Sequence, residues 1–566
     1  MTAPLAERAQ HRPSAAALVV IRENGSLDVM NARSVYEETV AHARALTELG
    51  IGAGDVVILI MGHSRTLFTV FLGALHVGAV PAILANPNPR LDQTFYAKRV
   101  GAVAENATAK AVVIDSELRL HLARVLEDMG SVSIVASDTL DRTPTAVRRF
   151  DGPIAAPDDL ALLQYTSGTT GIHKGVAHTH RAILDFIDAK MQKLGIGRDD
   201  VVVNWLPLYH DLGLISGFLL PLLSGLKTVL ISPFHWARDP AVLFRAISEY
   251  RGTLCWMPNS ALGHCVRAVR ESDLHGVDLR SWRILSCGGE PVRWATLRAF
   301  IDRFAAYGFE TNAVQIGYGM AENVEAATHT TTPERRPPIV DWIDARRLQD
   351  EARAVPMPAG ESGGASVVSC GSPLPGTEIG IAGPDGRVAG DRHVGEVLVR
   401  SSYMLSGGYF RRPDVTAEAV RDGWFHTGDL GYIADGELYV CGRRSDVIIL
   451  AGRKIHPEDI ELIADAVEGV APGRTVAFGV ADPQLGTDRV VVLCEVAKGW
   501  TGEHVDIARE VRKTAAHLLD VTVGAVRVVP RGWIIKTSSG KLARQANREK
   551  YLAELGVDPS STGQTT

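Results

Sequence analysis

Short apolar runs alternate with stretches of helical periodicity through the first third of this chain, and this alternation restricts the fold more than any other feature. The runs typical of buried strands are VVILIMG, VGAVPAILA and KAVVIDS. Before the first of them, SVYEETVAHARALTELGIGAGD has apolar residues at helical spacing, followed by Gly50 and Gly52 as stop signals. Strands that alternate with helices favour an α/β architecture with covered sheets.

The second half of the chain changes character twice. From about Val367, short β-type segments (EIGIAG, GEVLVRS and ELYVCG) are separated by Gly and Asp turns. After GRRSDVIIL, the sequence indicates a helix (HPEDIELIADAVEG), two strands (TVAFGVAD and RVVVLCEVA) and a second helix (IAREVRKTAAHLL), which together make a small α+β unit. A chain of 566 residues is also too long for one core.

We therefore predict a mixed α/β and α+β protein with two domains. The large N-terminal domain covers residues 1–443, with two covered sheets and a β-rich subdomain. The small, mobile C-terminal α+β domain covers residues 444–556, and the boundary lies near Arg443–Ser445. Residues 330–364 are rich in Pro, Arg, Glu and Gly and are interpreted as a surface insertion, with one amphipathic piece, DWIDARRLQDEA. The polar tail, residues 557–566, is expected to be disordered.

Charge and cysteine usage exclude several classes of protein. Lys and Arg number 59 against 65 Asp and Glu, and no basic block is present, which argues against nucleic acid as a main partner. The most apolar early run, Leu67 to Leu84, contains His76 and indicates a buried helix and a strand, so we expect no membrane span. The six cysteines are scattered without a C-x-x-C pair, and we expect reduced core thiols in a cytoplasmic protein.

One loop, in LLQYTSGTTGIHKGVAHTH, has a composition suited to phosphate. Between Thr166 and Gly175 it contains three glycines, four Ser or Thr hydroxyls and Lys174. Freed backbone N–H groups, hydroxyls and an ammonium suit a phosphate chain. The spacing does not match G-x-x-x-x-G-K-[ST], because Gly171 precedes Lys174 by three residues and Gly175 follows it. A helix-like stretch, HRAILDFIDAKMQKLG, comes next, so we expect the loop to lie between a strand and a helix. Taken alone, such a loop is more often a solvated turn.

Four further stretches place polar residues among glycines. They are SCGGEPV (286–292), IGYGMAE (316–322), GWFHTGDLGYI (423–433) and IIKTSSGKL (534–542). In this order, with the loop first, they resemble the adenylate-forming superfamily of acyl-CoA synthetases, fatty-acyl-AMP ligases and peptide-synthetase adenylation domains. The resemblance covers nearly the whole chain, and it rests on the five motifs in sequence because any one of them is weak.

Within that superfamily, several segments look most like the fatty-acyl-AMP ligase branch. These are WLPLYHDLGLI, YGMAE with Ala321, SCGSPLPG and GRKIHPEDIE, together with the 330–364 insertion. The resemblance implies activation of a carboxylic acid by ATP to an acyl adenylate, followed by transfer to the phosphopantetheine thiol of CoA or of a holo acyl carrier protein. The alternatives are an acyl-CoA synthetase, a relative that only uses an acyl adenylate made elsewhere, and a luciferase-type oxygenase. Fatty, aromatic and polycyclic acids fit the apolar pocket region equally well.

The resemblance also implies roles for individual residues. Lys541 would bridge the carboxylate and the α-phosphate, and its charge would stabilise the anionic transition state. Glu322 would bind Mg²⁺ alongside the phosphates as a hard oxygen ligand. His210 would flank the acyl carboxylate. These three residues form the expected catalytic set.

The nucleotide is expected to contact a larger set. Tyr318 would stack on adenine, Asp429 would accept hydrogen bonds from the ribose, and Arg443 would hold the ribose and phosphate side. The complete set is Thr166, Ser167, Gly168, Thr169, Thr170, Gly171, Lys174, Gly288, Gly289, Glu290, Gly317, Tyr318, Gly319, Met320, Ala321, Asp429 and Arg443. Singly, a turn aspartate, a core tyrosine or a surface arginine would each have a structural explanation.

The sequence departs from the family pattern at three positions. His173 replaces a common proline, Ala321 lacks a hydroxyl found in many relatives, and Ser445 stands where the hinge residue is usually Asp or Lys. Together these departures leave open a weakened adenylation step.

Overall fold

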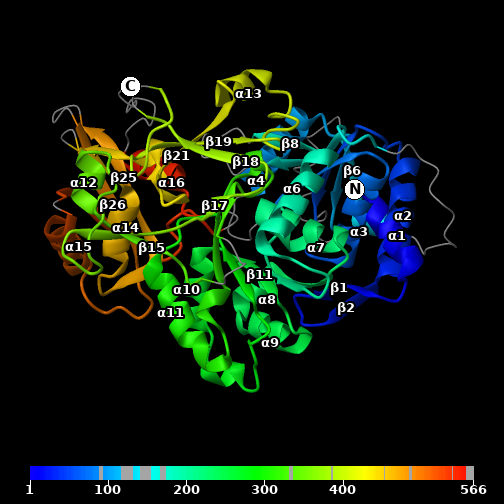
Figure 1. The fold of residues 1–566 in the computed structure, drawn as a ribbon, viewed down its shortest axis with the longest axis horizontal. Helices are drawn as coiled ribbons and strands as arrows, with labels where there is room; N and C mark the ends of the chain where they lie inside the picture. Colours follow the sequence, from blue (N-terminus) through cyan, green and yellow to red (C-terminus); the bar gives the residue numbers. More distant parts are fainter. Residues whose placement is uncertain are drawn as a thin grey trace.

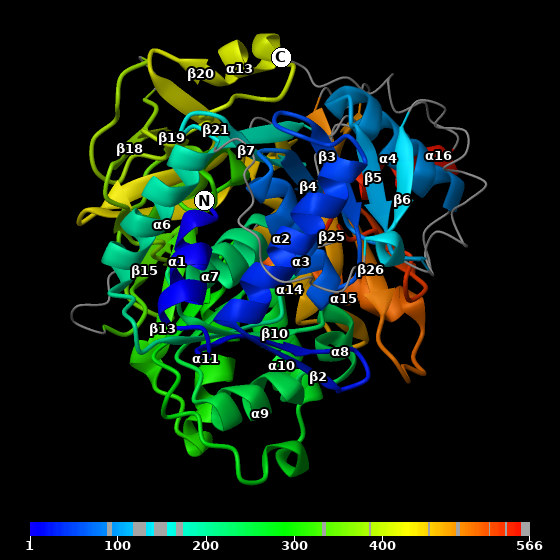
Figure 2. The same ribbon diagram turned by 90° about the vertical axis from the view of Figure 1, so that its right-hand side faces the viewer.

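The computed structural model describes residues 1–87, 93–116, 132–140, 155–165, 174–330, 336–383, 386–450, 453–482, 487–519, 521–537 and 540–555. Figure 1 shows the blue N-terminal helices on one side of the molecule and the orange and red C-terminal elements on the other. The turned view in Figure 2 brings the N-terminal elements to the front and leaves the C-terminal strands behind them. The mixed α/β character predicted from the sequence is confirmed.

A nine-stranded sheet forms the main core, in the order β17-β14-β13-β12-β11-β9-β10-β1-β2. Its strands are β1 (Ala16–Ile21), β2 (Leu27–Asn31), β9 (Val201–Asn204), β10 (Lys227–Ile231), β11 (Leu254–Met257), β12 (Ile284–Cys287), β13 (Val314–Tyr318), β14 (Thr328–His329) and β17 (Ser372–Pro373). The neighbours from β13 to β1 are parallel. Helices α9 (Ala241–Tyr250), α10 (Asn259–Ala268) and α11 (Trp294–Phe304) connect them, which accounts for strands that are apolar on both faces.

A second, four-stranded parallel sheet has the order β4-β3-β5-β6. It consists of β3 (Val56–Ile60), β4 (Val80–Ile83), β5 (Ala111–Ile114) and β6 (Ser133–Ala136), with helices α2 (Ala32–Glu48), α3 (Arg65–His76) and α4 (Gln93–Ala107). The run from Leu67 to Leu84 forms part of α3 and then β4, as predicted. Across the described residues, helices long and apolar enough to cross a membrane are absent.

The prediction that the loop from Thr166 to Gly175 leads from a strand into a helix is wrong. Strand β7 (Leu160–Tyr165) pairs antiparallel with β8 (Gly175–Thr179), so the loop joins two strands. Helix α6 (His180–Leu194) begins only after β8, with the Thr179 hydroxyl accepting from the Ala182 N–H, and it ends at Gly195 as predicted. Every residue of β8 is buried, so the strand lacks the polar alternation that marks a half-buried strand in a sequence.

The β-type segments after Val367 form a five-stranded sheet, and the predicted insertion packs against it. The sheet contains β18 (Thr377–Ile381), β19 (Gly395–Ser401), β20 (Val420–Arg421), β21 (Trp424–Ala434) and β22 (Glu437–Arg443). The insertion forms strand β15 (Val340–Asp344), helix α12 (Ala345–Asp350) and the start of β16 (Gly364–Val368). Ile343 and Leu348 are buried against Tyr432 and Tyr439 of β21 and β22.

The C-terminal residues form an α+β unit around the three-stranded sheet β25-β26-β27. Its elements are β23 (Ile448–Leu450), β24 (Arg453–Ile455), α14 (Pro457–Asp465), β25 (Val470–Asp482), β26 (Thr487–Val496), α15 (His504–Leu519), β27 (Val523–Val529) and α16 (Arg544–Glu554). The predicted helices α14 and α15 and strands β25 and β26 are confirmed, whereas β27 and α16 were not predicted. All six cysteines are free thiols.

Candidate active site

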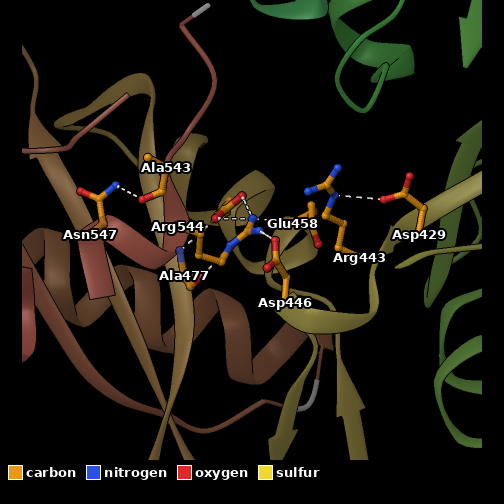
Figure 3. Close-up of polar contacts among 9 residues, drawn as sticks. Asp429, Arg443, Asp446, Glu458, Ala477, Ala543, Arg544 and Asn547 are labelled. Atoms are coloured by element: carbon orange, nitrogen blue, oxygen red, sulfur yellow. Dashed lines mark hydrogen bonds and ion pairs between the residues drawn. The ribbon is translucent and has the colours of Figure 1, made fainter. Parts of the chain in front are cut away.

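Tyr318, at the end of β13, is joined to two residues of the β-rich sheet. Its hydroxyl donates to Asp429 Oδ2 at 2.7 Å. Arg443 Nε donates to Asp429 Oδ1 at 3.0 Å (Figure 3). Asp429 and Arg443 face each other because they are register partners on β21 and β22. Burial, together with the charge of Asp429, raises the pKa of Tyr318 well above its ordinary value, so the phenol remains a donor. Three residues expected around the nucleotide therefore meet in one hydrogen-bonded chain.

Glu322 lies in the 3₁₀ turn η7 (Ala321–Asn323), directly after β13. Its Oε1 accepts a hydrogen bond from the Tyr409 hydroxyl at 2.7 Å. Lys174 Nζ, at the end of the Gly/Ser/Thr loop, lies 5.0 Å from the centroid of the same Tyr409 ring. Burial raises the pKa of Glu322, and the Tyr409 hydrogen bond partly offsets this rise. Tyr409 thus links two expected ligand-binding residues, although it lies in none of the five sequence motifs.

Lys541 reaches the same region from the C-terminal unit. A Cβ atom built on Gly289 would lie 3.8 Å from Lys541 Nζ. Burial and the charge of Lys541 together lower the pKa of His210 to about 4, so its imidazole is neutral at pH 7. His210 Nδ1 also lies 4.0 Å from Asp211 Oδ1. The structure therefore brings Lys541, His210 and Gly289 together, although they are far apart in the sequence.

Two of the predicted glycines permit close approach of backbone segments. A Cβ on Gly288 would lie 2.6 Å from the Gly317 carbonyl oxygen, and a Cβ on Gly319 would lie 2.1 Å from that of Glu325. Glu290 accepts a hydrogen bond from the Ser260 N–H near the start of α10, which gives this carboxylate a local structural partner. Met320 packs into apolar clusters beside the β-rich sheet.

The remaining predicted residues lie in the Gly/Ser/Thr loop itself. Thr166, Ser167, Gly168, Thr169, Thr170 and Gly171 are outside the described residues, as is His173. Lys174 is the described end of this loop, and its contact with Tyr409 directs it toward Glu322.

The donor set near Glu322 is consistent with magnesium. Groups of three or more His, Cys, Asp or Glu side chains placed to hold a metal are absent from the part of the chain that the structure describes. Mg²⁺ does not require such a cage, because proteins usually bind it through one or two carboxylates together with substrate phosphates. Glu322 offers a single half-buried carboxylate of the right kind close to a lysine suited to phosphate.

Comparison with known proteins shows the family. The family model described as AMP-binding enzyme matches residues 5–410. This chain belongs to the AMP-binding enzyme family. A candidate acyl-CoA synthetase of Caulobacter vibrioides is 32% identical over 525 residues, covering 91% of this chain and 89% of the relative. The medium-chain-fatty-acid–[acyl-carrier-protein] ligase JamA of Moorena producens is 32% identical over 565 residues, covering 96% and 93% of the two chains.

A solved structure is also similar to this AMP-binding enzyme. It comes from studies of fatty acyl-adenylate ligases of E. coli and L. pneumophila, and it matches with a TM-score of 0.90 and 28% identity over 98% of both chains. The family match includes Lys174, His210, Tyr318, Glu322 and Tyr409. Lys541 lies beyond it, in the C-terminal part that the longer alignments and the structural match cover.

Proposed function

We propose that this AMP-binding enzyme activates a fatty or other apolar carboxylic acid with ATP and transfers the acyl group to the phosphopantetheine thiol of a holo acyl carrier protein. The observation that carries the proposal is the convergence of Lys541, His210 and Gly289 beside the Tyr318–Asp429–Arg443 chain. The Lys541 ammonium, the neutral His210 imidazole and the exposed Gly289 backbone can together bind a carboxylate next to a phosphate that it attacks. The names of the similar ligases support the same chemistry.

In the first step, a carboxylate oxygen of the acid attacks the α-phosphorus of ATP, and pyrophosphate leaves. Lys541 stabilises the negative charge that develops between the carboxylate and the α-phosphate. His210 is neutral at pH 7, so it does not act as the acid that would protonate the attacking carboxylate. Tyr318, Asp429 and Arg443 hold the adenosine, and Lys174 with the loop 166–173 holds the phosphates. Mg²⁺ bound with Glu322 would neutralise charge on the leaving pyrophosphate.

In the second step, the thiol sulfur attacks the acyl carbonyl carbon and displaces AMP. We propose that residues 444–556 act as a mobile domain that rotates about Arg443–Ser445 between the two steps, away from a large domain of residues 1–443. Because Lys541 lies beside Gly289, the described arrangement suits the first step. Free cysteines support a cytoplasmic location, where thiols stay reduced.

The insertion supports a carrier protein over free CoA as the acceptor. Its Ile343 is fully buried against β21 and β22, and Tyr432 donates to Asp341 Oδ2 at 2.8 Å. Helix α12 also packs beside strand β24 of the C-terminal unit. The insertion is anchored to the β-rich sheet and also packs on the C-terminal unit, so it limits how far the C-terminal unit can rotate. A carrier protein brings its own docking surface and can recover the affinity lost in this way.

The test is ATP–pyrophosphate exchange over a panel of fatty, aromatic and polycyclic acids, followed by addition of either CoA or a holo acyl carrier protein. Exchange with apolar acids and thioester formed on the carrier protein are the expected results. Rapid thioester formation on CoA would favour the acyl-CoA synthetase. If no acid supports exchange but the enzyme transfers the acyl group of a supplied acyl adenylate, the enzyme catalyses only the second half-reaction.

A further inference from the structure

The chain makes an unusual turn directly after Glu322. Val324 has φ +65° and ψ −52°, and the Glu325 N–H donates to the Asn323 carbonyl at 2.7 Å. This is a γ-turn with positive φ at its central residue, a form that is rare and strained. The strain is greater for valine, because its β-branched side chain disfavours positive φ. Relief of this strain would move Glu322, which directly precedes the three residues of the turn, Asn323 to Glu325.

A buried ion pair holds the far end of the turn. The Glu325 carboxylate pairs with Lys190 and accepts a hydrogen bond from the Ser216 hydroxyl. Lys190 Nζ also donates to Ser216 Oγ at 2.6 Å. These three residues, the Lys190 triad, are almost inaccessible to solvent, with exposed fractions of 1% for Lys190, 6% for Glu325 and 0% for Ser216. Lys190 Nζ also lies 5.6 Å from the centroid of the Trp256 ring and 5.8 Å from that of Phe186, so aromatic rings lie beside the buried ammonium.

Each member of the Lys190 triad belongs to a different segment of the candidate active site. Glu325 follows Glu322 through the strained turn. Ser216 lies on the π-helix η3 (Leu212–Leu219), which starts two residues after His210. Lys190 lies on α6, which follows strand β8 and therefore Lys174. A π-helix at this place is consistent with a functional role, since such segments occur frequently at functional sites.

We propose that Lys190, Glu325 and Ser216 are positioning residues that hold the strained turn closed, and so fix the Glu322 carboxylate relative to His210 and Lys174. The proposal rests on the proposed function for the roles of Glu322, His210 and Lys174. A pair that served stability alone could be replaced by apolar residues of similar volume with little loss, because burying two charges is itself costly. A pair that holds a strained turn cannot be replaced in this way without loss of geometry.

The first experiment replaces the pair by apolar residues in the full chain, as Lys190→Met with Glu325→Met. We expect a cooperative fold and unchanged AMP affinity, because Tyr318, Asp429 and Arg443 are left in place. Pyrophosphate exchange should fall about 100-fold in kcat with little change in the KM of the acid, since a misplacement of about 1 Å can have this effect. In calorimetric titrations, the tightening of ATP binding by Mg²⁺ should also be lost.

A second pair of variants separates turn strain from simple packing. Val324→Gly added to the double variant should raise its exchange rate at least about tenfold, because glycine adopts positive φ without strain. Val324→Ala is the matched control. It also removes apolar volume but keeps the β-carbon, and it should restore little. If alanine rescues as well as glycine, the strained turn is not what the triad holds, and the inference fails.

Should the double variant not fold, Ser216→Ala is measured instead. It keeps the Lys190–Glu325 ion pair and removes the hydroxyl that bonds both members. About a tenfold loss of exchange at unchanged AMP affinity is expected from the loss of hydrogen bonds to charged groups. Exchange within twofold of the wild type in a folded triad variant would overturn the proposal. If the wild type exchanges no acid, yet Mg²⁺ tightens ATP binding and the triad variant loses this effect, the proposed function fails and the triad stands. If Mg²⁺ has no effect on ATP binding by the wild type, the inference fails.

Discussion

We expect Arg544→Met to destabilise the C-terminal unit by about 3 kcal/mol at pH 7, the lower end of the range for breaking a buried ion pair. Arg544 begins helix α16, three residues after Lys541, and its side chain is 13% exposed. It contacts Asp446, it contacts Glu458 Oε1 at 3.1 Å, and it donates to the Ala477 carbonyl at 3.0 Å (Figure 3). It also pairs with Glu461 Oε1 at 3.0 Å. Asp446 and Glu458 are partly exposed, so solvent can stabilise their charges once Arg544 is removed. The expected loss of stability therefore lies at the lower end of the range for a buried pair.

The loss of stability should depend on pH with a definite sign. Burial raises the pKa of Glu461 to about 7, and the charge of Arg544 opposes this rise. Without Arg544, the pKa of Glu461 in the folded state rises further above its unfolded value. A carboxyl group of this kind favours folding below its unfolded pKa, and this contribution is lost as the pH rises through the folded pKa. Up to about pH 7 the wild type and the variant lose this contribution alike, so the deficit of the variant should grow as the pH rises above about 7.

Chemical denaturation at pH 5 and pH 8, with limited proteolysis of the C-terminal unit, measures this deficit. The rate of adenylation should fall as well, because the contacts of Arg544 fix the chain three residues after Lys541. The matched control is Arg509→Met, since Arg509 forms an exposed pair with Asp506 on α15 and should change little. A deficit that is equal at the two pH values, or no larger than that of the control, would refute the reasoning about Glu461.

Four further predictions follow from the site. Lys541→Ala should abolish acyl-AMP formation and leave AMP affinity unchanged, because this cation acts in the transition state; acyl-AMP formed at the wild-type rate would contradict this. Tyr409→Phe should lower pyrophosphate exchange about tenfold by removing the hydrogen bond to Glu322, and an unchanged rate would separate Tyr409 from the site. Ser445→Pro should depress thioester formation more than adenylation, measured as the two half-reactions, and equal losses would argue against a hinge. Deletion of Pro333–Gly363 should increase turnover with CoA; turnover that is already high and unchanged by the deletion would show that the insertion is no barrier.

Elements with local signals could be predicted from the sequence. Helix α6 has its cap at Thr179 and its stop at Gly195, and both are visible in the sequence. Strands β25 and β26 contain the apolar runs VAFGVA and VVVLC, and both strands were expected. Strand β8 was missed because five buried residues without alternation resemble the entry to a helix. The insertion was expected to lie at the surface, but its Ile343 is fully buried. Its own sequence carries no sign of this, because the partners Tyr432 and Tyr439 come from strands about ninety residues later.

The same distinction holds within the candidate site. The motifs point to Tyr318, Asp429 and Arg443, and the structure joins them by hydrogen bonds. Tyr409 could not be found in this way, since its partner Glu322 is 87 residues earlier in the chain. The positive φ of Val324 also has no sequence signal, because valine is among the residues least suited to that conformation.

The position of strand β1 in the nine-stranded sheet has a consequence for biosynthesis. Leu18 of β1 pairs with Thr228 of β10, so 210 residues must be synthesised after Leu18 before this partner exists. At about 5–20 residues per second, that takes about 10–40 s. The strands of the four-stranded sheet, from Val56 to Ala136, find their partners much sooner. The apolar segment AALVVI of β1 can pair early with β2 on one edge, but its other edge stays without its partner β10 for about 10–40 s. We expect a nascent-chain chaperone to cover it during this interval.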